Sequence, residues 1–163
     1  MRSIILFIAG IVVGTTIQAA LAQAPAQPAA ARLNHVALSV PDVGQALSYY
    51  GEKFGFREVV RNTNPQGQLA SAYIQISRDT FIELQQANAQ RPAGINHFGV
   101  EVPDIKGAVA AYRQRGLTVS DPNGPSAFTG GILANITDAN AGRIELSEQP
   151  ADGKLRKATE SWK

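Results

Sequence analysis

Apolar and polar residues alternate in two similar stretches, LNHVALSV at residues 33–40 and INHFGVEV at residues 95–102. Alternation with a period of two predicts a β-strand. A proline and an aspartate follow each stretch, and they end the strand and supply an N-cap for a helix. The next residues are apolar at helical spacing, and the first of these helices is expected to end at Gly55.

Three further strands are predicted after each helix, because β-branched and apolar runs alternate there with turn residues. Each half of the chain therefore has the order βαβββ, with units at 33–87 and 95–148. The predicted strands are FREVVRN (56–62), LASAYIQIS (69–77) and TFIELQQ (80–86) in the first unit, and LTVSD (117–121), ILANIT (132–137) and RIELSE (143–148) in the second.

The two units repeat one another at an offset of 62 residues. The repeated pairs are Asn34/Asn96, His35/His97, Val40/Val102, Pro41/Pro103, Asp42/Asp104 and, much later in each unit, Glu83/Glu145. Two widely separated matches at one offset indicate a tandem duplication of one supersecondary unit. The duplication also contains both histidines of the chain.

The four repeated ionisable side chains are expected on one face of the sheet. His35 and His97 lie on the first strand of each unit, and Glu83 and Glu145 lie on the last. Residues two apart on a strand share a face, so the apolar neighbours of each glutamate should pack under the helices. Other side chains on the same face as the four are Ser39, Phe81, Glu101 and Arg143.

Two imidazoles and two carboxylates suit a divalent transition metal such as Zn, Ni, Co, Mn or Fe. A single histidine on a strand is more often a hydrogen-bonded structural residue. Four such groups at equivalent positions of two repeats, His35, Glu83, His97 and Glu145, instead predict a metal site.

The ends of the chain differ from the repeats. Residues 1–22 combine Arg2, an uncharged apolar run and small residues at Ala20-Leu21-Ala22, which predicts a secretory signal peptide and a periplasmic or secreted protein, with a retained membrane anchor as the alternative. Residues 23–32 are rich in Ala, Pro and Gln and are expected to be a flexible lead-in, and residues 149–163 a polar tail.

Charge and cysteine content exclude other classes of function. Lys plus Arg number 15 and Asp plus Glu number 13, which gives a net charge of +2, or +1 once Arg2 is removed with the signal peptide. No clustered basic surface is indicated, so nucleic acid is not an expected partner. The chain has no cysteine, hence no disulfide framework and no lipid-modified N-terminus.

The motifs NHVALSVPDV, FIELQ, NHFGVEVPDI and DANAGRIEL resemble the vicinal oxygen chelate superfamily, which includes glyoxalase I, bleomycin-resistance proteins and extradiol dioxygenases. The resemblance covers about residues 33–148. It implies an α+β fold in which tandem βαβββ units form a curved mixed sheet around a central cleft. By position it implies metal binding by His35, Glu83, His97 and Glu145, the same residue types that glyoxalase I uses, with Glu145 or Glu83 as the catalytic base.

The resemblance leaves the reaction open. Ser39 stands where glyoxalase I typically carries an arginine, and methylmalonyl-CoA epimerase usually has Gln at the position of Glu83. We expect a glyoxalase I-like lyase or isomerase acting on a small substrate with two neighbouring oxygens. An extradiol-type dioxygenase and a non-catalytic binder of the bleomycin-resistance type are the alternatives. Arg143, Ser39, Glu101 and Phe81 are the expected substrate contacts.

A homodimer is the expected assembly. The connection between the two units, residues 86–95, is short and contains Pro92 and Gly94. Such a linker is predicted to hinder the second unit from folding back beside the first, which favours a metal site between two chains, as the resemblance to glyoxalase I also implies. A metal site closed within one chain is the alternative.

Overall fold

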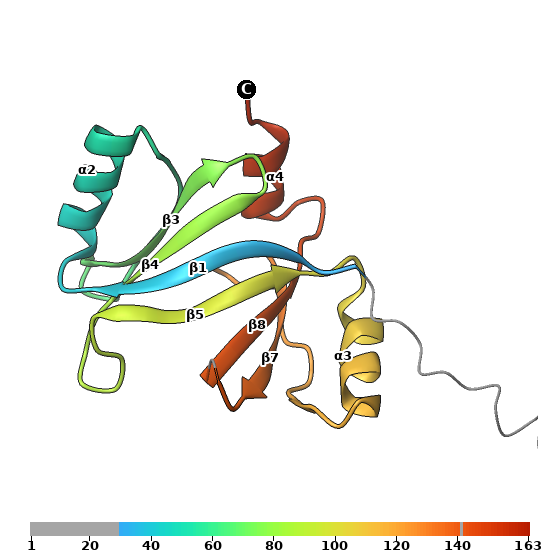
Figure 1. Cartoon of the computed structure of the whole chain (residues 1–163). Helices are drawn as coiled ribbons and strands as arrows, with labels where there is room; N and C mark the ends of the chain where they lie inside the picture. Colours follow the sequence, from blue (N-terminus) through green and yellow to red (C-terminus); the bar gives the residue numbers. More distant parts are fainter. Residues whose placement is uncertain (1–29, 141) are drawn as a thin grey trace, which may run out of the picture.

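The computed structural model describes residues 30–140 and 142–163 as one eight-stranded mixed sheet with three helices (Figure 1). The predicted α+β fold with two βαβββ units is confirmed. The elements are β1 (Arg32–Val40), α2 (Val43–Phe54), β2 (Arg57–Thr63), β3 (Leu69–Ser77), β4 (Thr80–Gln86), β5 (Gly94–Glu101), α3 (Ile105–Gln114), β6 (Thr118–Val119), β7 (Ile132–Asp138), β8 (Gly142–Glu148) and α4 (Lys154–Glu160).

The first strands of the two units meet in the middle of the sheet. The strand order is β2-β3-β4-β1-β5-β8-β7-β6, with β1 antiparallel to β5 and each of them parallel to the last strand of its own unit. His35 pairs with Gly99 and Ala37 pairs with His97. These two pairings are equivalent under the 62-residue offset, so the duplicated units are arranged about an approximate two-fold axis between β1 and β5.

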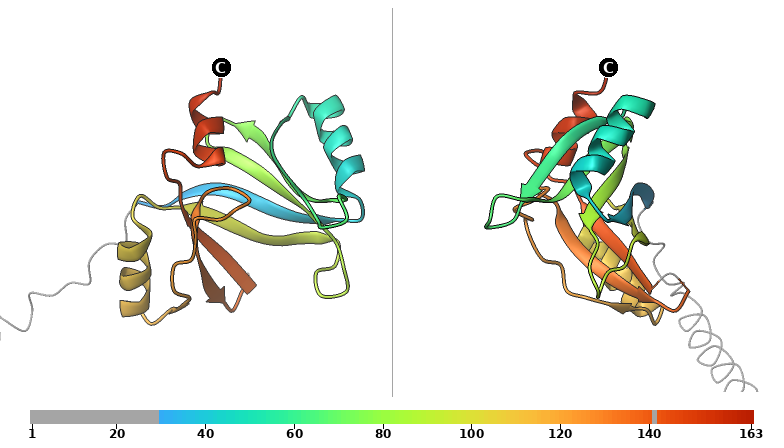
Figure 2. Two further views of the ribbon diagram at one scale, coloured as in Figure 1. Left: turned by 180° about the vertical axis from the view of Figure 1, so that it is seen from behind. Right: turned by 90° about the vertical axis from the view of Figure 1, so that its left-hand side faces the viewer.

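Helices α2 and α3 cover the face that the sequence predicts to be apolar. Each begins at the expected aspartate, since Asp42 accepts a hydrogen bond from the Gln45 backbone at 2.8 Å and Asp104 from the Gly107 backbone at 3.1 Å. The residues flanking each glutamate pack beneath these helices: Leu84 and Ile82 under α2, Leu146 and Ile144 under α3. Figures 1 and 2 show the two helices at opposite ends of the sheet, with β1 and β5 running between them.

The C-terminal segment is not simply a polar tail, because residues 154–160 form α4 on the opposite face of the sheet. Leu155 and Ala158 are buried there against Phe81, Tyr73 and Val60. Polar contacts also hold the helix, since the Ala158 carbonyl accepts hydrogen bonds from Gln75 Nε2 at 3.2 Å and from an Arg57 Nη at 3.1 Å.

The prediction that the linker is too tight for folding back within one chain is wrong. Asn88 and Arg91 form a turn with two backbone hydrogen bonds, and β5 then returns antiparallel to β1 in the same sheet. The first strands of both units therefore lie side by side in a single chain. The predicted signal peptide and residues 23–29 of the lead-in lie outside the described residues. None of the helices in the described ranges is long and apolar enough to cross a bilayer.

Candidate metal centre

The two histidines meet at the centre of the sheet because their strands are neighbours. Their Nε2 atoms are 3.2 Å apart, and the rings lie edge to face with centroids 5.2 Å apart. Gly99 makes the close approach feasible, since a Cβ atom at that position would lie 2.1 Å from the His35 ring. Both imidazoles are almost completely buried, with 1% and 2% of the residue exposed.

The two glutamates bring their carboxylates to the same place. A Glu83 oxygen lies 3.8 Å from His35 Nε2 and 3.6 Å from His97 Nε2, and Glu145 oxygens lie 3.8 Å and 3.9 Å from the same atoms. Metal–ligand bonds of about 2.0–2.2 Å put adjacent donors about 3.0–3.6 Å apart and opposite donors about 4.2 Å apart. The observed separations, 3.2–3.9 Å, lie between the lower limit for adjacent donors and the value for opposite donors, so the residues present fit a divalent transition metal.

Three of these residues form the tightest group. Donor atoms of His35, His97 and Glu145 all lie within 4.8 Å of one another, so these three buried residues could hold a metal ion. Glu83 is close to both imidazoles and completes the set of four that the 62-residue repeat singles out. The sheet thus brings all four predicted ligands together in one chain.

Burial controls the charge state of the centre. Burial, together with the charge on Arg143, lowers the pKa of His35 to about 4, and burial with the charges on Arg143, His35 and Arg91 lowers that of His97 to about 3. Both rings are therefore neutral at pH 7, which is the form that binds metals. Burial and the neighbouring Glu83 raise the pKa of Glu145 to about 7, and burial also raises the pKa of Glu83.

Arg143 lies at the edge of the centre, as predicted for a residue that contacts substrate. Its Nη2 atom is 2.6 Å from His97 Nδ1 and 2.9 Å from His97 Nε2. Its Nη1 atom is 3.6 Å from Glu145 and 3.2 Å from the amide oxygen of Asn135. Its side chain is 39% exposed, whereas those of the glutamates are 9% and 11% exposed. A positive charge thus lies where the buried centre approaches solvent.

Two of the other expected substrate contacts have different surroundings. Phe81 is buried in the cluster beneath α4, so the expectation that it lines the cleft is wrong. Ser39 shares the face of His35 but is also buried, and its hydroxyl has no hydrogen-bond partner among the described residues.

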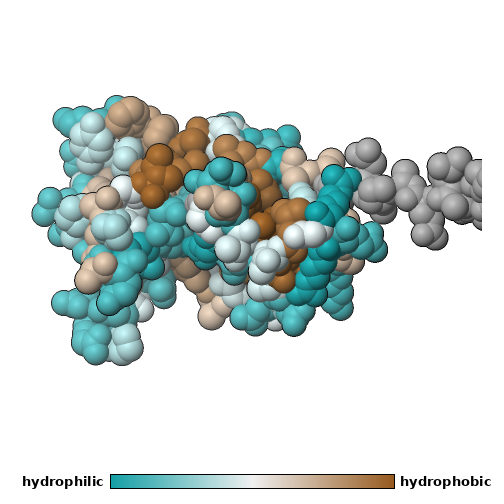
Figure 3. Space-filling model, turned by 60° about the horizontal axis from the view of Figure 1, so that its bottom comes forward, coloured by the Kyte–Doolittle hydropathy of each residue, from teal (hydrophilic) through white to brown (hydrophobic). Residues whose placement is uncertain are grey.

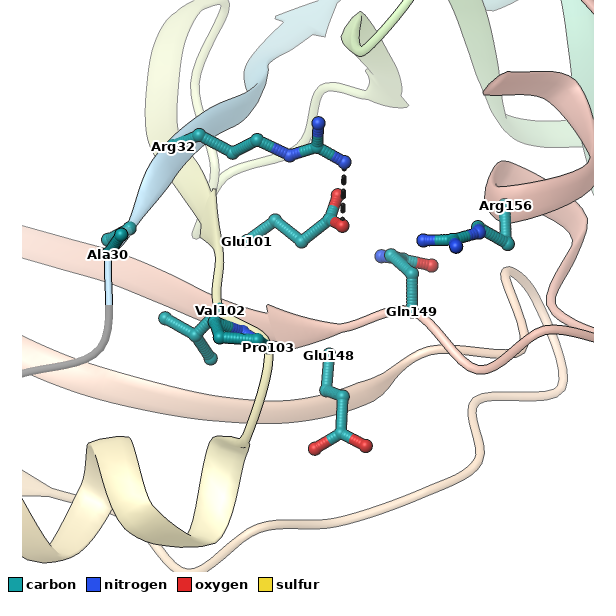
Figure 4. A pocket seen from close by; sticks show the side chains of 9 residues that line it. Ala30, Arg32, Glu101, Val102, Pro103, Glu148, Gln149 and Arg156 are labelled. Carbon is teal, nitrogen blue, oxygen red and sulfur yellow. Dashed lines mark hydrogen bonds and ion pairs between the residues drawn. The ribbon is translucent and has the colours of Figure 1, made fainter. Parts of the chain in front are cut away.

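Glu101 faces a separate cavity of about 460 Å³ at the other end of β5 (Figure 4). It pairs there with Arg32 at 2.8 Å, and Arg156 lies across the same cavity. Its second carboxylate oxygen accepts a hydrogen bond from the Asn34 amide at 3.1 Å. The expectation that Glu101 contacts a substrate at the metal centre is therefore not met, because its two oxygens are already bonded to Arg32 and Asn34.

Sequence reasoning missed Tyr73 and Asn135. Tyr73 is opposite Glu83 on the neighbouring strand and is hydrogen-bonded to it, and its ring lies 5.4 Å from the His35 ring. Asn135 is opposite Glu145 in the same way. The two positions are also 62 residues apart, so the repeat offset combined with the hairpin register could have identified both.

The chain belongs to the Glyoxalase/Bleomycin resistance protein/Dioxygenase superfamily, whose sequence profile matches residues 34–134. One relative is a lactoylglutathione lyase of Arabidopsis thaliana, 23% identical over 125 residues that make up 72% of this chain and 44% of that protein. The chain spans less than half the length of the curated relatives it matches.

Solved structures share the fold. Methylmalonyl-CoA epimerase from Mycobacterium tuberculosis has a TM-score of 0.60 at 23% identity, over 71% of this chain and 86% of the epimerase. The 2,3-dioxygenase LapB from Pseudomonas sp. KL28 has a TM-score of 0.61 at 17% identity, over 72% of this chain and 42% of that one. At these identities the likeness concerns the fold alone.

Proposed function

We propose that the chain is an exported, metal-dependent enzyme of this superfamily, a glyoxalase I-like lyase or isomerase acting on a small substrate with two neighbouring oxygens. The observation that carries the proposal is the meeting of two neutral imidazoles and two buried carboxylates at one point of a single chain. His35, Glu83, His97 and Glu145 would hold the ion. When bound, the metal would supply Lewis-acid polarisation of the substrate oxygens.

The protein's own groups suit a proton transfer beside such a centre. Glu145 has a pKa of about 7 in the metal-free protein, so its carboxylate, when it leaves the ion, can take up a proton near neutral pH, as a general base must. Glu83, buried and with a raised pKa, is the second candidate for this role. Arg143 can bind an anionic group of the substrate, since its guanidinium is both near the carboxylates and partly exposed.

The substrate is expected to be small or to enter from the side of Arg143. Helix α4 covers the ligand-bearing face of the first unit, and Phe128 packs on Tyr73 with ring centroids 5.4 Å apart. In the second unit the position equivalent to Phe81 is Arg143, which is partly exposed. The two halves of the cleft are thus unequal, and the polar half is the open one.

A dioxygenase is the second candidate, because His35, His97 and Glu145 form a set of two histidines and one carboxylate. Such a set with open positions is typical of non-haem Fe(II) oxygenases. The Glu83→Gln variant separates the two functions. If it retains iron and oxidises catechols, the dioxygenase is supported, whereas loss of metal and of all activity supports a centre with four ligands.

Metal analysis followed by a substrate screen tests the proposal. We expect about one equivalent of transition metal per chain, loss of that metal in His35→Ala, and turnover of one class among α-keto aldehyde–thiol adducts, catechols and acyl thioesters. A metal-free protein that binds small molecules without converting them would instead support the non-catalytic binder of the bleomycin-resistance type.

Export is part of the proposal, supported by the composition of residues 1–22. Expression of the whole chain in a bacterial host, followed by cell fractionation and mass measurement, is the test. A periplasmic protein that begins at Gln23 agrees with cleavage. Full-length chain that stays in the membrane fraction supports the retained anchor.

We also propose a two-fold homodimer in which each chain holds its own complete metal site. Figure 3 shows apolar residues gathered in a band across one face of the molecule, with polar residues around it. The central strands carry exposed apolar side chains, Ile95 at 79% and Leu33 at 47% exposure. Contiguous apolar surface of this kind is typical of an interaction site. Light scattering should give a dimer that Ile95→Glu dissociates without loss of metal, and a monomeric wild-type protein would contradict the proposal.

A further inference from the structure

Each of the two histidines is preceded by an asparagine whose side chain faces the imidazole. The Asn34 amide oxygen lies 3.0 Å from His35 Nδ1, and the Asn96 amide oxygen lies 2.8 Å from His97 Nδ1. The other ring nitrogen of each histidine, Nε2, is turned toward the carboxylates of Glu83 and Glu145. The duplication therefore repeats an asparagine–histidine pair and not only a histidine.

An amide oxygen can only accept a hydrogen bond, so its bond to Nδ1 requires that nitrogen to carry the ring proton. The lone pair of a neutral ring is then on Nε2, where a metal can bind it. We propose that Asn34 and Asn96 are positioning residues that hold both histidines in the Nδ1-protonated tautomer and present Nε2 to the ion. The inference rests on the proposed metal-binding function. It assigns to the asparagine of each repeat the role of orienting the histidine that follows it.

The first pair is held by a polar chain that leads away from the centre. Asn34 is buried, and its amide nitrogen donates to Glu101 Oε2 at 3.1 Å. Arg32 donates to the other oxygen of Glu101 at 2.8 Å and pairs with Asp79 at 3.2 Å. This chain fixes the orientation of the Asn34 amide, because a flipped amide would point its nitrogen at the ring and its oxygen at a carboxylate.

The second pair has a competitor. Arg143 Nη2 lies 2.6 Å from His97 Nδ1, the nitrogen that faces Asn96, and 2.9 Å from Nε2, the nitrogen that faces the carboxylates. A guanidinium can only donate, so a bond from Arg143 to Nδ1 and the bond from Nδ1 to Asn96 require opposite tautomers of His97. A bond from Arg143 to Nε2 would occupy the lone pair that a metal needs. Metal binding through Nε2 therefore requires His97 to bond Asn96 and to release Arg143, whose guanidinium then becomes available to an anionic group.

The test compares Asn96→Leu, which removes the acceptor at similar volume, with Asn96→Asp, which keeps it. Histidine tautomers are read from ¹⁵N chemical shifts of the metal-free protein, and zinc affinity is measured by competition with a chelator. We expect Asn96→Leu to reduce the Nδ1-protonated fraction of His97 and to weaken zinc binding about 10–100-fold, while Asn96→Asp retains both properties. Wild-type tautomer and affinity in Asn96→Leu, or equal losses in both folded variants, would overturn the proposal.

The Asn34 pair gives an independent test through its partner. Asn34→Asp keeps the acceptor but brings two carboxylates together, so zinc binding should weaken. Adding Glu101→Gln replaces the repelling oxygen with an amide and should restore most of the affinity. A double variant that binds zinc no more tightly than Asn34→Asp contradicts the role of the hydrogen bond between Asn34 and Glu101.

Failure of the proposed function is distinguishable, because tautomers are read without metal. A wild-type protein with Asn-dependent tautomers and no zinc affinity refutes only the metal site. Zinc binding with tautomers that do not respond to the asparagines refutes only the positioning.

Discussion

Metal affinity is expected to depend on pH through the two buried carboxylates, chiefly Glu145. In the metal-free protein its pKa is about 7, whereas those of His35 and His97 are about 4 and 3. A ligand must lose its proton to bind a metal, so affinity falls as pH falls below the pKa of the metal-free ligand. Between pH 7 and pH 5 Glu145 becomes protonated, and Glu83, whose pKa is also raised by burial, adds to the uptake of protons, while both imidazoles remain neutral.

The size of the effect follows from these values. At pH 5, two units below a pKa of about 7, about 1% of Glu145 is ionised, so affinity falls about 100-fold from its high-pH limit, or about 2.7 kcal/mol. Histidines with the ordinary pKa of about 6.5 would each add roughly another 30-fold loss at pH 5. A centre with exposed imidazoles would therefore be far more sensitive to acid than this one.

Zinc titrations from pH 5 to pH 8 against a chelator of known affinity measure the dependence. We expect a slope between one and two in log affinity against pH below pH 7, because each of the two glutamates contributes at most one proton, a plateau above it, and release of about one to two protons per zinc at pH 6 by calorimetry in buffers of different ionisation enthalpy. Glu145→Gln should flatten the slope in this window. A slope approaching three, or a wild-type slope in Glu145→Gln, would refute the assignment of the proton.

Other variants test the fold and the edge of the site. Leu155→Ala should lower the free energy of unfolding by about 2–5 kcal/mol in denaturant titrations, because the side chain is buried beneath α4, and a loss below 1 kcal/mol would argue against that packing. Gly99→Ala should cost about 1–3 kcal/mol and weaken metal binding, because its Cβ would overlap the His35 ring. Its control is Gly51→Ala, where the nearest atom is 3.9 Å away and a gain of about 0.5–1 kcal/mol is expected. Arg143→Met should weaken binding of an anionic probe such as oxalate to the zinc-loaded protein about 10–100-fold, and an unchanged affinity would remove Arg143 from the substrate site.

The duplication made most of the fold predictable. Period-two alternation and proline–aspartate stops marked β1, β5 and the helices after them, and Ile82 and Leu84 indicated which face lies under α2. The equivalence of residues 62 apart then brought both histidines and both glutamates to one face. These inferences succeeded because strand parity and the 62-residue repeat offset can both be read from the sequence without knowledge of tertiary contacts.

The remaining features depend on tertiary contacts. Residues 149–163 contain few apolar residues, and Leu155 with Ala158 becomes a buried helix face only against Phe81. The same contact removes Phe81 from the cleft, although Phe81 lies on the predicted face of its strand. The prediction for the short linker fails because the turn at Asn88–Arg91 reverses the chain within a few residues.

X-ray absorption spectroscopy of the zinc-loaded chain tests the central claim most directly. Multiple scattering from imidazole rings counts the histidine ligands, and the first shell identifies nitrogen or oxygen donors at about 2.0–2.2 Å. The account predicts two imidazoles with carboxylate oxygens in wild-type protein, and one imidazole at most in His35→Ala measured with excess zinc, since that variant is expected to lose its metal on purification. A wild-type spectrum with fewer than two imidazoles, or one unchanged in His35→Ala, would contradict a centre built from both repeats.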